Sequence, residues 1–505
     1  MTLSLILQSA AALLLSLSQP KGDAIPDFSR VGYHYGEDPI PTVPVVKTLK
    51  APKKGRDASA LLQQAIDEMK GPGAILLKAG TWNLDTTVVI PRSGIVLRGE
   101  GEKTRLVATA RKQYTLLKIG RDSKRKLDSA RKSRISDSYT PVGQLWVRVE
   151  TPGNFRKGER VVIFRPGTQE WITDLHMDRI PMHPSGTTKQ WRVAEYNLYW
   201  ERIVTDIVDD KIYLDSPVVM AIDDQYGGGL LIPCATPRIS ECGIENMALI
   251  SVFDESIKDD QGRWTDEQHA WTGISVQGAE HCWIRNVSTT YFGYSLFSLR
   301  TGSRNITVEN CRVYMPVSIV TGSRRYAFNL STGAELCLVR DCSCDNDRHG
   351  CVTGARVCGP NVFLRCKGTT MWSDFGPHHR WSTGLLYDNI DTDYQLDCQD
   401  RDNWGSGHGW AGANLVFWNC RSKTITCQSP WVSAQNWAVG CIGTIDSKKS
   451  GKKEFKNTTR TYKDGLQRPD GIFYSHGKHV EPASLYEYQL KERLAAGTRL
   501  YKPAQ

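Results

Sequence analysis

The second half of the chain repeats a short pattern of apolar and polar positions. Eight segments of β-branched or aromatic residues each run into a bend, usually Asn, Asp or Gly, whose residue type tolerates left-handed backbone. From Asn286 onward, successive bends are 21 to 31 residues apart. Constant strands joined by loops of variable length indicate a solenoid of stacked rungs. The eight bend positions are Asn246, Asn286, Asn310, Asp341, Arg365, Asn389, Asn419 and Gly440.

The positions around each bend predict which side chains face the interior. Apolar residues stand two positions before the bend, from Ile244 to Ala438, and one position after it, from Met247 to Cys441. A leucine-rich repeat has a similar period, but the Leu ladder that it needs is missing. Short strands, tight bends and long loops on one side favour an all-β fold, a parallel β-helix.

The N-terminal part of the chain carries a more specific signal. An extended Pro-rich stretch leads into an amphipathic helix over residues 55–67, with Asp57 placed to cap it. Short strands follow over residues 74–82, 88–91 and 93–101. This order resembles the first rungs of the pectate-lyase-like superfamily of right-handed parallel β-helix proteins. The resemblance implies the fold and not the reaction, because the superfamily includes lyases, hydrolases, epimerases and phage tailspikes.

Changes in pattern divide the chain into five segments. Residues 1–22 hold an apolar run that is too short to span a bilayer and is typical of a signal peptide, so we expect a secreted or periplasmic protein without a membrane span. A capping box at Ser484 predicts a short helix that covers the open end of the solenoid. The other segments are the first rungs (23–120), a β-rich insertion (121–237), the main rungs with the catalytic loops (238–445) and a basic C-terminal segment with the capping helix (446–505).

The net charge indicates which kinds of partner to expect, and the positions of the cysteines indicate their oxidation state. The chain carries 64 Lys and Arg against 54 Asp and Glu, and this net charge of +10 favours an anionic partner. We expect no nucleic-acid partner, because the basic residues are dispersed and the chain carries an export signal. Fourteen cysteines in an exported chain are typical of a disulfide framework. Eight of them, however, fall in the predicted interior columns, where Cys acts as a small hydrophobe. We therefore predict buried, mostly reduced thiols, and no zinc site.

The candidate chemistry lies where long loops return to strands. His269, His349, His379 and His408 occupy equivalent positions there. Rungs stack about 4.8 Å apart, so the last three histidines should form a row. Stacked histidines can also serve only to satisfy loop hydrogen bonds, but Arg, His and Asp concentrate in three adjacent loops. The other residues of this predicted site are Arg325, Tyr326, Asp347, Arg348, Asp374, His378, Arg380, Trp381, Asp402 and Trp410.

These residue types suit β-elimination on an acidic polysaccharide that contains uronic acid. The reaction needs a cation that neutralises the sugar carboxylate, a base that removes the C5 proton and an acid that protonates the departing oxygen. Arginine suits the first role, neutral histidine the second, and tyrosine or another histidine the third. The predicted catalytic residues are Tyr326, Arg348, His349, His379, Arg380 and His408, and the predicted substrate-binding residues are His269, Arg325, Asp347, Asp374, His378, Trp381, Asp402 and Trp410.

Two other functions fit the same sequence. A β-helix glycoside hydrolase needs two carboxylates about 5 to 9.5 Å apart, and Asp374 with Asp347 or Asp402 could supply them. The other alternative is a non-catalytic, glycan-binding surface protein. Many relatives in the resembled superfamily use Ca²⁺, but no loop here has recognisable calcium spacing, and we expect no organic cofactor. We expect a monomer.

Overall fold

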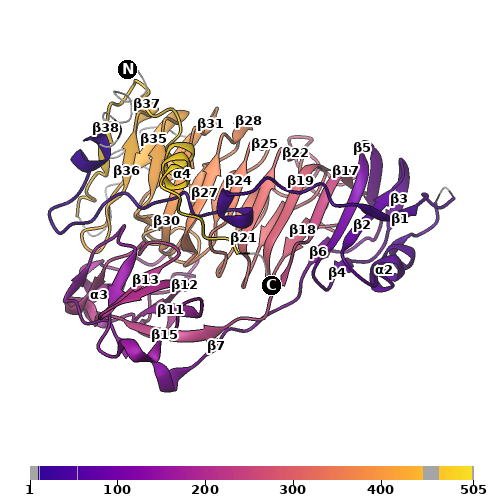
Figure 1. Ribbon diagram of the computed structural model, residues 1–505. Helices are drawn as coiled ribbons and strands as arrows, with labels where there is room; N and C mark the ends of the chain where they lie inside the picture. The colour runs from indigo at the N-terminus through magenta and orange to yellow at the C-terminus, as the bar shows by residue number, and fades with distance from the viewer. Residues whose placement is uncertain (1–9, 11, 54, 447–465, 503–505) are drawn as a thin grey trace, which may run out of the picture.

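The computed structural model describes residues 10, 12–53, 55–446 and 466–502, so part of the predicted signal segment and the basic stretch at 448–453 lie outside the described residues. The described strands build a parallel β-helix (Figure 1). Its two parallel sheets share one interior, which the largest apolar cluster fills. The seven-stranded sheet contains β4 (Val88–Ile90), β6 (Thr115–Ile119), β18 (Thr272–Val276), β20 (Ser295–Leu299), β23 (Tyr326–Leu330), β26 (His349–Thr353) and β29 (Gly376–Pro377).

The larger sheet carries the repeat that the sequence predicts. All of its pairings are parallel. Its strands are β1 (Val45–Leu49), β2 (Gly73–Leu77), β3 (Gly80–Leu84), β5 (Ile95–Ala108), β16 (Ile239–Ser240), β17 (Gly243–Ser251), β19 (Ala279–Thr290), β21 (Arg304–Glu309), β22 (Arg312–Tyr314), β24 (Leu338–Arg340), β25 (Ser343–Asp345), β27 (Cys358–Leu364), β28 (Lys367–Thr369), β30 (Ser382–Asp388), β31 (Asp391–Thr392), β32 (Gln395–Cys398), β33 (Gly412–Ala413), β34 (Val416–Trp418), β35 (Arg421–Cys427), β36 (Trp437–Val439), β37 (Ile442–Ile445) and β38 (Ile472–Tyr474).

Strand pairing confirms the predicted register. Each residue of the predicted column from Ile244 to Ala438 pairs with the next member on the neighbouring rung. The column continues to Leu97 at one end and to Phe473 at the other. All eight predicted bend residues have φ between 50° and 65°, in the left-handed region. Asn fits this position because its short side chain tolerates left-handed backbone.

The cysteines are buried thiols, as predicted. All fourteen lie among the described residues and all are free, and only Cys234 is partly exposed. Cys311 N donates a hydrogen bond to Cys342 Sγ at 3.4 Å, and Cys342 Sγ donates to the Arg340 carbonyl at 3.1 Å. Neighbouring thiols therefore interact with backbone groups along the interior of the β-helix.

Replacing Cys342 with serine is expected to lower the free energy of unfolding by about 1–3 kcal/mol, because a hydroxyl enters an apolar column. Chemical denaturation measures this loss, and C234S, at a partly exposed position, is the matched control. We also expect all fourteen thiols to react under denaturing, non-reducing conditions. A thiol count that rises when reductant is added would contradict the assignment.

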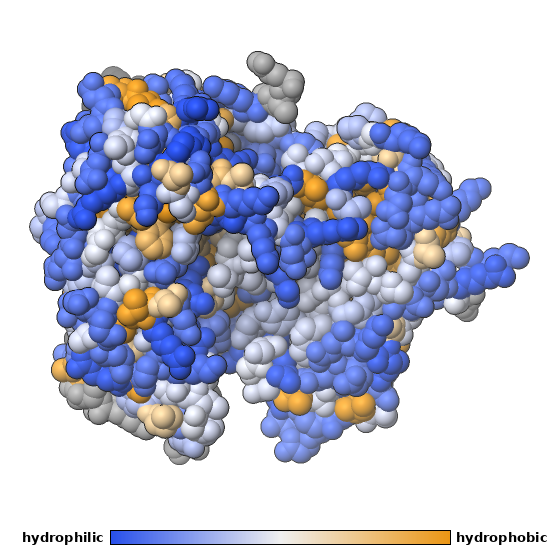
Figure 2. Space-filling view, turned by 90° about the horizontal axis from the view of Figure 1, so that it is seen from below, coloured by the Kyte–Doolittle hydropathy of each residue, from blue (hydrophilic) through white to orange (hydrophobic). Residues whose placement is uncertain are grey.

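An antiparallel sheet occupies the middle of the insertion and lies beside the β-helix (Figure 1). Seen from below, the surface is hollowed between the insertion side and the N-terminal rungs (Figure 2). The elements of the insertion are β7 (Lys126–Leu127), β8 (Ser133–Arg134), β9 (Tyr139–Thr140), β10 (Trp146–Arg148), β11 (Arg160–Arg165), α3 (Gln169–Asp174), β12 (Leu198–Val208), β13 (Lys211–Leu214), β14 (Ile222–Asp223) and β15 (Leu230–Ala235).

A buried ion-pair network fastens the insertion to the rungs. Arg304 of β21 pairs with Asp215, and its Nη1 donates to the carbonyl of Glu201 at 2.7 Å. The Tyr35 hydroxyl donates to Asp215 at 2.9 Å. Arg304 and Asp215 are 1% exposed each, so the attachment is a desolvated charge pair rather than a surface contact.

One predicted helix lies near each end of the chain. Helix α2 (Ser59–Asp67) starts two residues after Asp57, whose Oδ1 accepts a hydrogen bond from Ser59 N at 3.2 Å. Helix α4 (Leu485–Ala495) begins after Ser484, whose hydroxyl accepts from Glu487 N at 3.2 Å, as the capping box predicts. Its apolar residues pack with strands from β24 to β36, so α4 covers a face of the large sheet rather than its open end.

The described part of the predicted signal segment also contacts this face. Leu17 is 4% exposed and belongs to the apolar cluster that contains α4 residues. Export stays a prediction. In the part of the chain that the structure describes, no helix has the length and hydropathy that a bilayer crossing needs.

Candidate active site

The predicted site residues converge at one end of the seven-stranded sheet. Tyr326 begins β23, His349 begins β26, and the two residues are partners in the parallel register. His378 and His379 follow β29, and His408 comes from the loop before β33. Neighbouring rings in this His–Tyr cluster have centroids 4.6 to 5.3 Å apart. His349 adjoins His378 and not His379, so the predicted row of three histidines contains a fourth member.

All four histidines are uncharged at neutral pH. Burial lowers the pKa of His349 to about 4, that of His379 to about 3 and that of His408 to about 2. Burial also holds the pKa of His378 well below its usual 6.5, and neighbouring positive groups act in the same direction. Neutral imidazole is the state that a general base needs.

Hydrogen bonds fix the tautomer of His378. Arg401 Nη1 lies 3.1 Å from His378 Nδ1, and because a guanidinium can only donate, Nδ1 accepts. The neutral ring then carries its proton on Nε2, which lies 3.1 Å from the Tyr326 hydroxyl oxygen. That oxygen also faces Ser323 N at 3.4 Å. Since both neighbours donate, the hydroxyl proton of Tyr326 is left for another acceptor, which is the arrangement that a general acid needs.

Asp374 and Arg401 orient the His–Tyr cluster. Asp374 Oδ1 lies 3.3 Å from His349 Nδ1 and 2.7 Å from Arg401 Nη2, and Arg401 also pairs with Asp397 at 3.1 Å. Burial alone would raise the pKa of the Asp374 carboxyl, but Arg401 and His349 hold it below its usual value. Arg401 and Asp397 are not among the site residues that the sequence predicts. Arg401 stands in a loop rich in charged residues, and nothing in that local pattern shows that it is buried.

Three arginines near the cluster have no carboxylate partner. Arg348, Arg356 and Arg380 are partly exposed, and no carboxylate of the described residues lies within ion-pair distance of them. Arg380 donates instead to the Ser406 hydroxyl at 2.6 Å. The positive charges of Arg380 and Arg356 contribute to the lowered pKa of His379, after burial. Uncompensated guanidinium groups beside neutral bases form a site for an anion, best a carboxylate.

A groove of about 270 Å³ adjoins the cluster on the side of Arg325. Trp372 lines it and is 39% exposed, and the guanidinium of Arg263 lies 5.1 Å from a ring centroid of Trp372. Arg325 is buried and donates to the Ser318 carbonyl at 2.7 Å. Behind it, burial raises the pKa of Asp347. An exposed indole with basic neighbours suits the ring and the negative charge of an acidic sugar.

Three of the predicted substrate-binding residues lie elsewhere in the fold. His269 is fully buried, and its ring nitrogens hydrogen-bond the Ser251 hydroxyl and backbone carbonyls. Trp381 and Trp410 are fully buried in the apolar cluster of the insertion. The ring centroids of Trp171 and Trp381 are 4.9 Å apart there. These side chains cannot stack on a sugar, so the structure assigns them to packing. Asp402 is partly exposed, and its N–H donates to Asp400 Oδ1 at 2.8 Å.

The cluster makes the stability of the fold depend on pH. His349, for example, titrates near its usual 6.5 when unfolded and near 4 when folded, so the unfolded state binds more protons between these values. The stabilisation is complete above pH 6.5 and is lost as the pH falls toward 4. We expect the melting temperature to fall steadily as the pH is lowered below 6.5. A melting temperature that is the same at pH 7 and at about pH 5 would contradict this expectation.

Within the described ranges, no group of three or more His, Cys, Asp or Glu side chains is arranged to hold a metal ion.

The known proteins that resemble this chain do so only distantly. No protein-family model matches the sequence, and the search of curated proteins gives no significant match. Among solved structures, the tailspike of E. coli bacteriophage HK620, in complex with a pentasaccharide, has a TM-score of 0.41 at 11% identity over 78% of this chain and 55% of its own. Geobacillus virus E2 ORF18 gives 0.37 at 10% identity, over 79% of this chain and 57% of its own. An alginate lyase from Paenibacillus sp. str. FPU-7 gives 0.35 at 9% identity, over 86% and 100%.

Proposed function

We propose that the protein is an exported, monomeric polysaccharide lyase that cleaves an acidic polysaccharide by β-elimination. The observation that carries the proposal is the grouping of neutral histidines with arginines that no described carboxylate neutralises. A site built in this way attracts a carboxylate-bearing sugar and offers it a base. The net charge of +10 favours the approach of a polyanion.

Each chemical role falls to a different part of the cluster. Arg348 and Arg380 bind the uronate carboxylate, which makes the C5 proton more acidic. His379, neutral and partly exposed, takes that proton. The electron pair of the broken C5–H bond forms the C4–C5 double bond, and the C4–O4 bond breaks. Tyr326 gives its hydroxyl proton to the departing O4, while His378 Nε2–H stabilises the phenolate that forms.

The products of a polysaccharide panel test this proposal. Purified protein is incubated with uronate-containing polymers and with neutral polymers. We expect the ultraviolet absorbance of an unsaturated uronate to rise only with the former. New reducing ends without that absorbance would indicate hydrolysis, and binding without any product would indicate a glycan-binding protein.

Hydrolysis has one specific observation in its favour. Burial raises the pKa of Asp347, while Arg401 holds the pKa of Asp374 low, and hydrolases use carboxylates with such opposite shifts. Asp374, however, is 2% exposed, and its Oδ1 is engaged by Arg401 and His349. This engagement leaves it poorly placed to attack a sugar or to activate water, so lyase chemistry fits the geometry better.

A further inference from the structure

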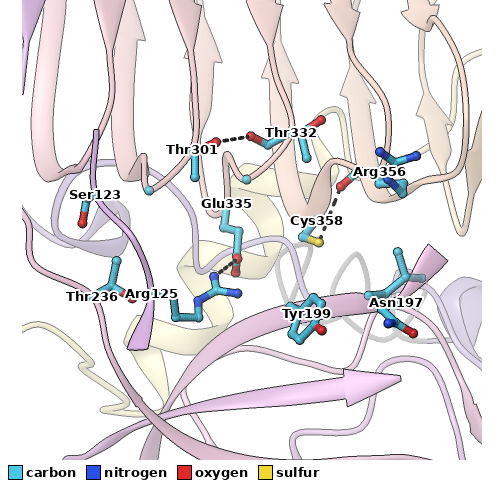
Figure 3. Close-up of a pocket in the computed structure, with 13 residues that line it drawn as sticks. Ser123, Arg125, Asn197, Tyr199, Thr236, Thr301, Thr332, Glu335, Arg356 and Cys358 are labelled. Atoms are coloured by element: carbon cyan, nitrogen blue, oxygen red, sulfur yellow. Dashed lines mark hydrogen bonds and ion pairs between the residues drawn. The ribbon is translucent and has the colours of Figure 1, made fainter. Parts of the chain in front are cut away.

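A second cavity lies between the insertion and the rungs. It has a volume of about 190 Å³, which is room for roughly six water molecules and fits one sugar ring. Turns after β20, β23 and β26 form one wall through Thr301, Thr332 and Arg356, and the start of β12 forms the other through Asn197 and Tyr199 (Figure 3). The cavity therefore exists only because the insertion packs beside these turns.

Hydroxyl groups in the wall are oriented to accept hydrogen bonds. The Thr301 hydroxyl donates to the Thr332 carbonyl at 3.3 Å, and the Thr332 hydroxyl donates to the Ala355 carbonyl at 2.6 Å. The Thr236 hydroxyl donates to Glu201 at 2.7 Å. Because their protons are used, these oxygens have only lone pairs to offer to the cavity. Such a wall matches a molecule rich in hydroxyl donors.

The charges in the cavity are unequal. Glu335 is 2% exposed, and its two oxygens accept from Arg125 Nη2 at 3.0 Å and from Glu201 N at 2.9 Å. Burial also raises the pKa of Glu335, although Arg125 acts in the opposite direction. Arg356, by contrast, has no ion-pair partner among the described residues, and its guanidinium lies 5.2 Å from the Tyr196 ring. Arg356, a positive residue without a counter-ion among the described residues, thus belongs to the lining of the cavity.

The cavity is connected to the His–Tyr cluster through Arg356. Arg356 N donates to the Arg380 carbonyl at 2.8 Å, so the two residues stand on adjacent turns. The charge of Arg356 also contributes to the lowered pKa of His379. Arg356 therefore belongs both to the lining of the cavity and to the surroundings of His379.

We propose that this cavity is a second subsite that holds one acidic sugar of the polymer, with its carboxylate on Arg356 and its ring beside Tyr199. The proposal deepens the proposed function and rests on it for the identity of the polymer. The insertion then contributes directly to substrate recognition, because Tyr199 and Asn197 belong to it.

Binding of uronate oligomers to R356Q tests the subsite. The measurements use Y326F as the parent, so that long oligomers are cleaved only slowly, and titration calorimetry as the readout. Loss of a charged hydrogen bond is expected to weaken binding of a long uronate oligomer about tenfold. Binding of a single uronate should weaken less than binding of the long oligomer, because Arg348 and Arg380 remain at the cluster. R300Q is the matched control, since Arg300 lies in the turn after β20 and is exposed.

The outcomes separate this inference from the proposed function. Unchanged binding of the long oligomer by R356Q, or an equal loss for single uronate and for neutral oligomers, overturns the subsite. If wild-type protein cleaves nothing but R356Q still loses affinity selectively for long uronate oligomers, the subsite stands and the lyase proposal fails. Should R356Q fail to fold, R356K decides, because it keeps the charge and loses the planar fork. It is expected to bind the long oligomer more weakly than the parent, and equal binding overturns the subsite.

Discussion

Replacing His379 with alanine is expected to lower kcat/KM on an acidic polysaccharide by about two to four orders of magnitude, the usual contribution of a general base. His379 is neutral because burial and neighbouring arginines lower its pKa to about 3. It is also partly exposed, whereas His349 is fully enclosed, so His379 is the histidine that a substrate reaches more readily. Initial rates of unsaturated product formation measure the effect.

The control for this experiment is H476A, because His476 is exposed and lies outside the His–Tyr cluster. H379A should melt near the wild-type temperature, so that lost activity reflects chemistry. A companion variant, Y326F, should reduce kcat with little change in KM, since it removes the proton donated to the leaving oxygen. If H379A keeps the wild-type rate, His379 is not the base. If H476A loses as much activity as H379A, the effect does not come from the His–Tyr cluster.

Replacing Arg304 with methionine is expected to lower the free energy of unfolding by about 3–5 kcal/mol, because it breaks a buried ion pair by removing one partner. Arg304 is the buried partner of Asp215, and its removal leaves that carboxylate uncompensated at 2% side-chain exposure. The Tyr35 hydroxyl at 2.9 Å and Ile203 N at 2.8 Å would still donate to Asp215, but both donors are uncharged. Because these residues join β21 to the insertion, the loss weakens the attachment of the insertion to the β-helix.

Chemical denaturation with two comparisons tests this expectation. R134M breaks the exposed Arg134–Asp224 pair and should lower the free energy of unfolding by no more than about 1 kcal/mol. The double variant R304M/D215N removes both buried charges and should recover part of the stability. If R304M lowers the free energy of unfolding no more than R134M does, the buried network does not hold the insertion.

The local pattern of the chain determined the β-helix rungs. Bends from Asn246 to Gly440 and the column from Ile244 to Ala438 follow from residue type at fixed short distances, because each rung meets only its neighbours. Interior thiols such as Cys342 follow from the same register. The grouping of His349, His379 and Tyr326 also follows, since equivalent positions on successive rungs lie close together.

Only the tertiary structure decided what the long loops and the insertion do. Trp381 and Trp410 share the sequence context of the histidines, yet the insertion packs against them and removes them from any surface. Arg401 fixes the tautomer of His378 from another loop, and Arg356 lines a cavity together with Tyr199 of the insertion. These relations depend on contacts between residues far apart in the chain, whose geometry is set by packing and burial, and no local spacing records them.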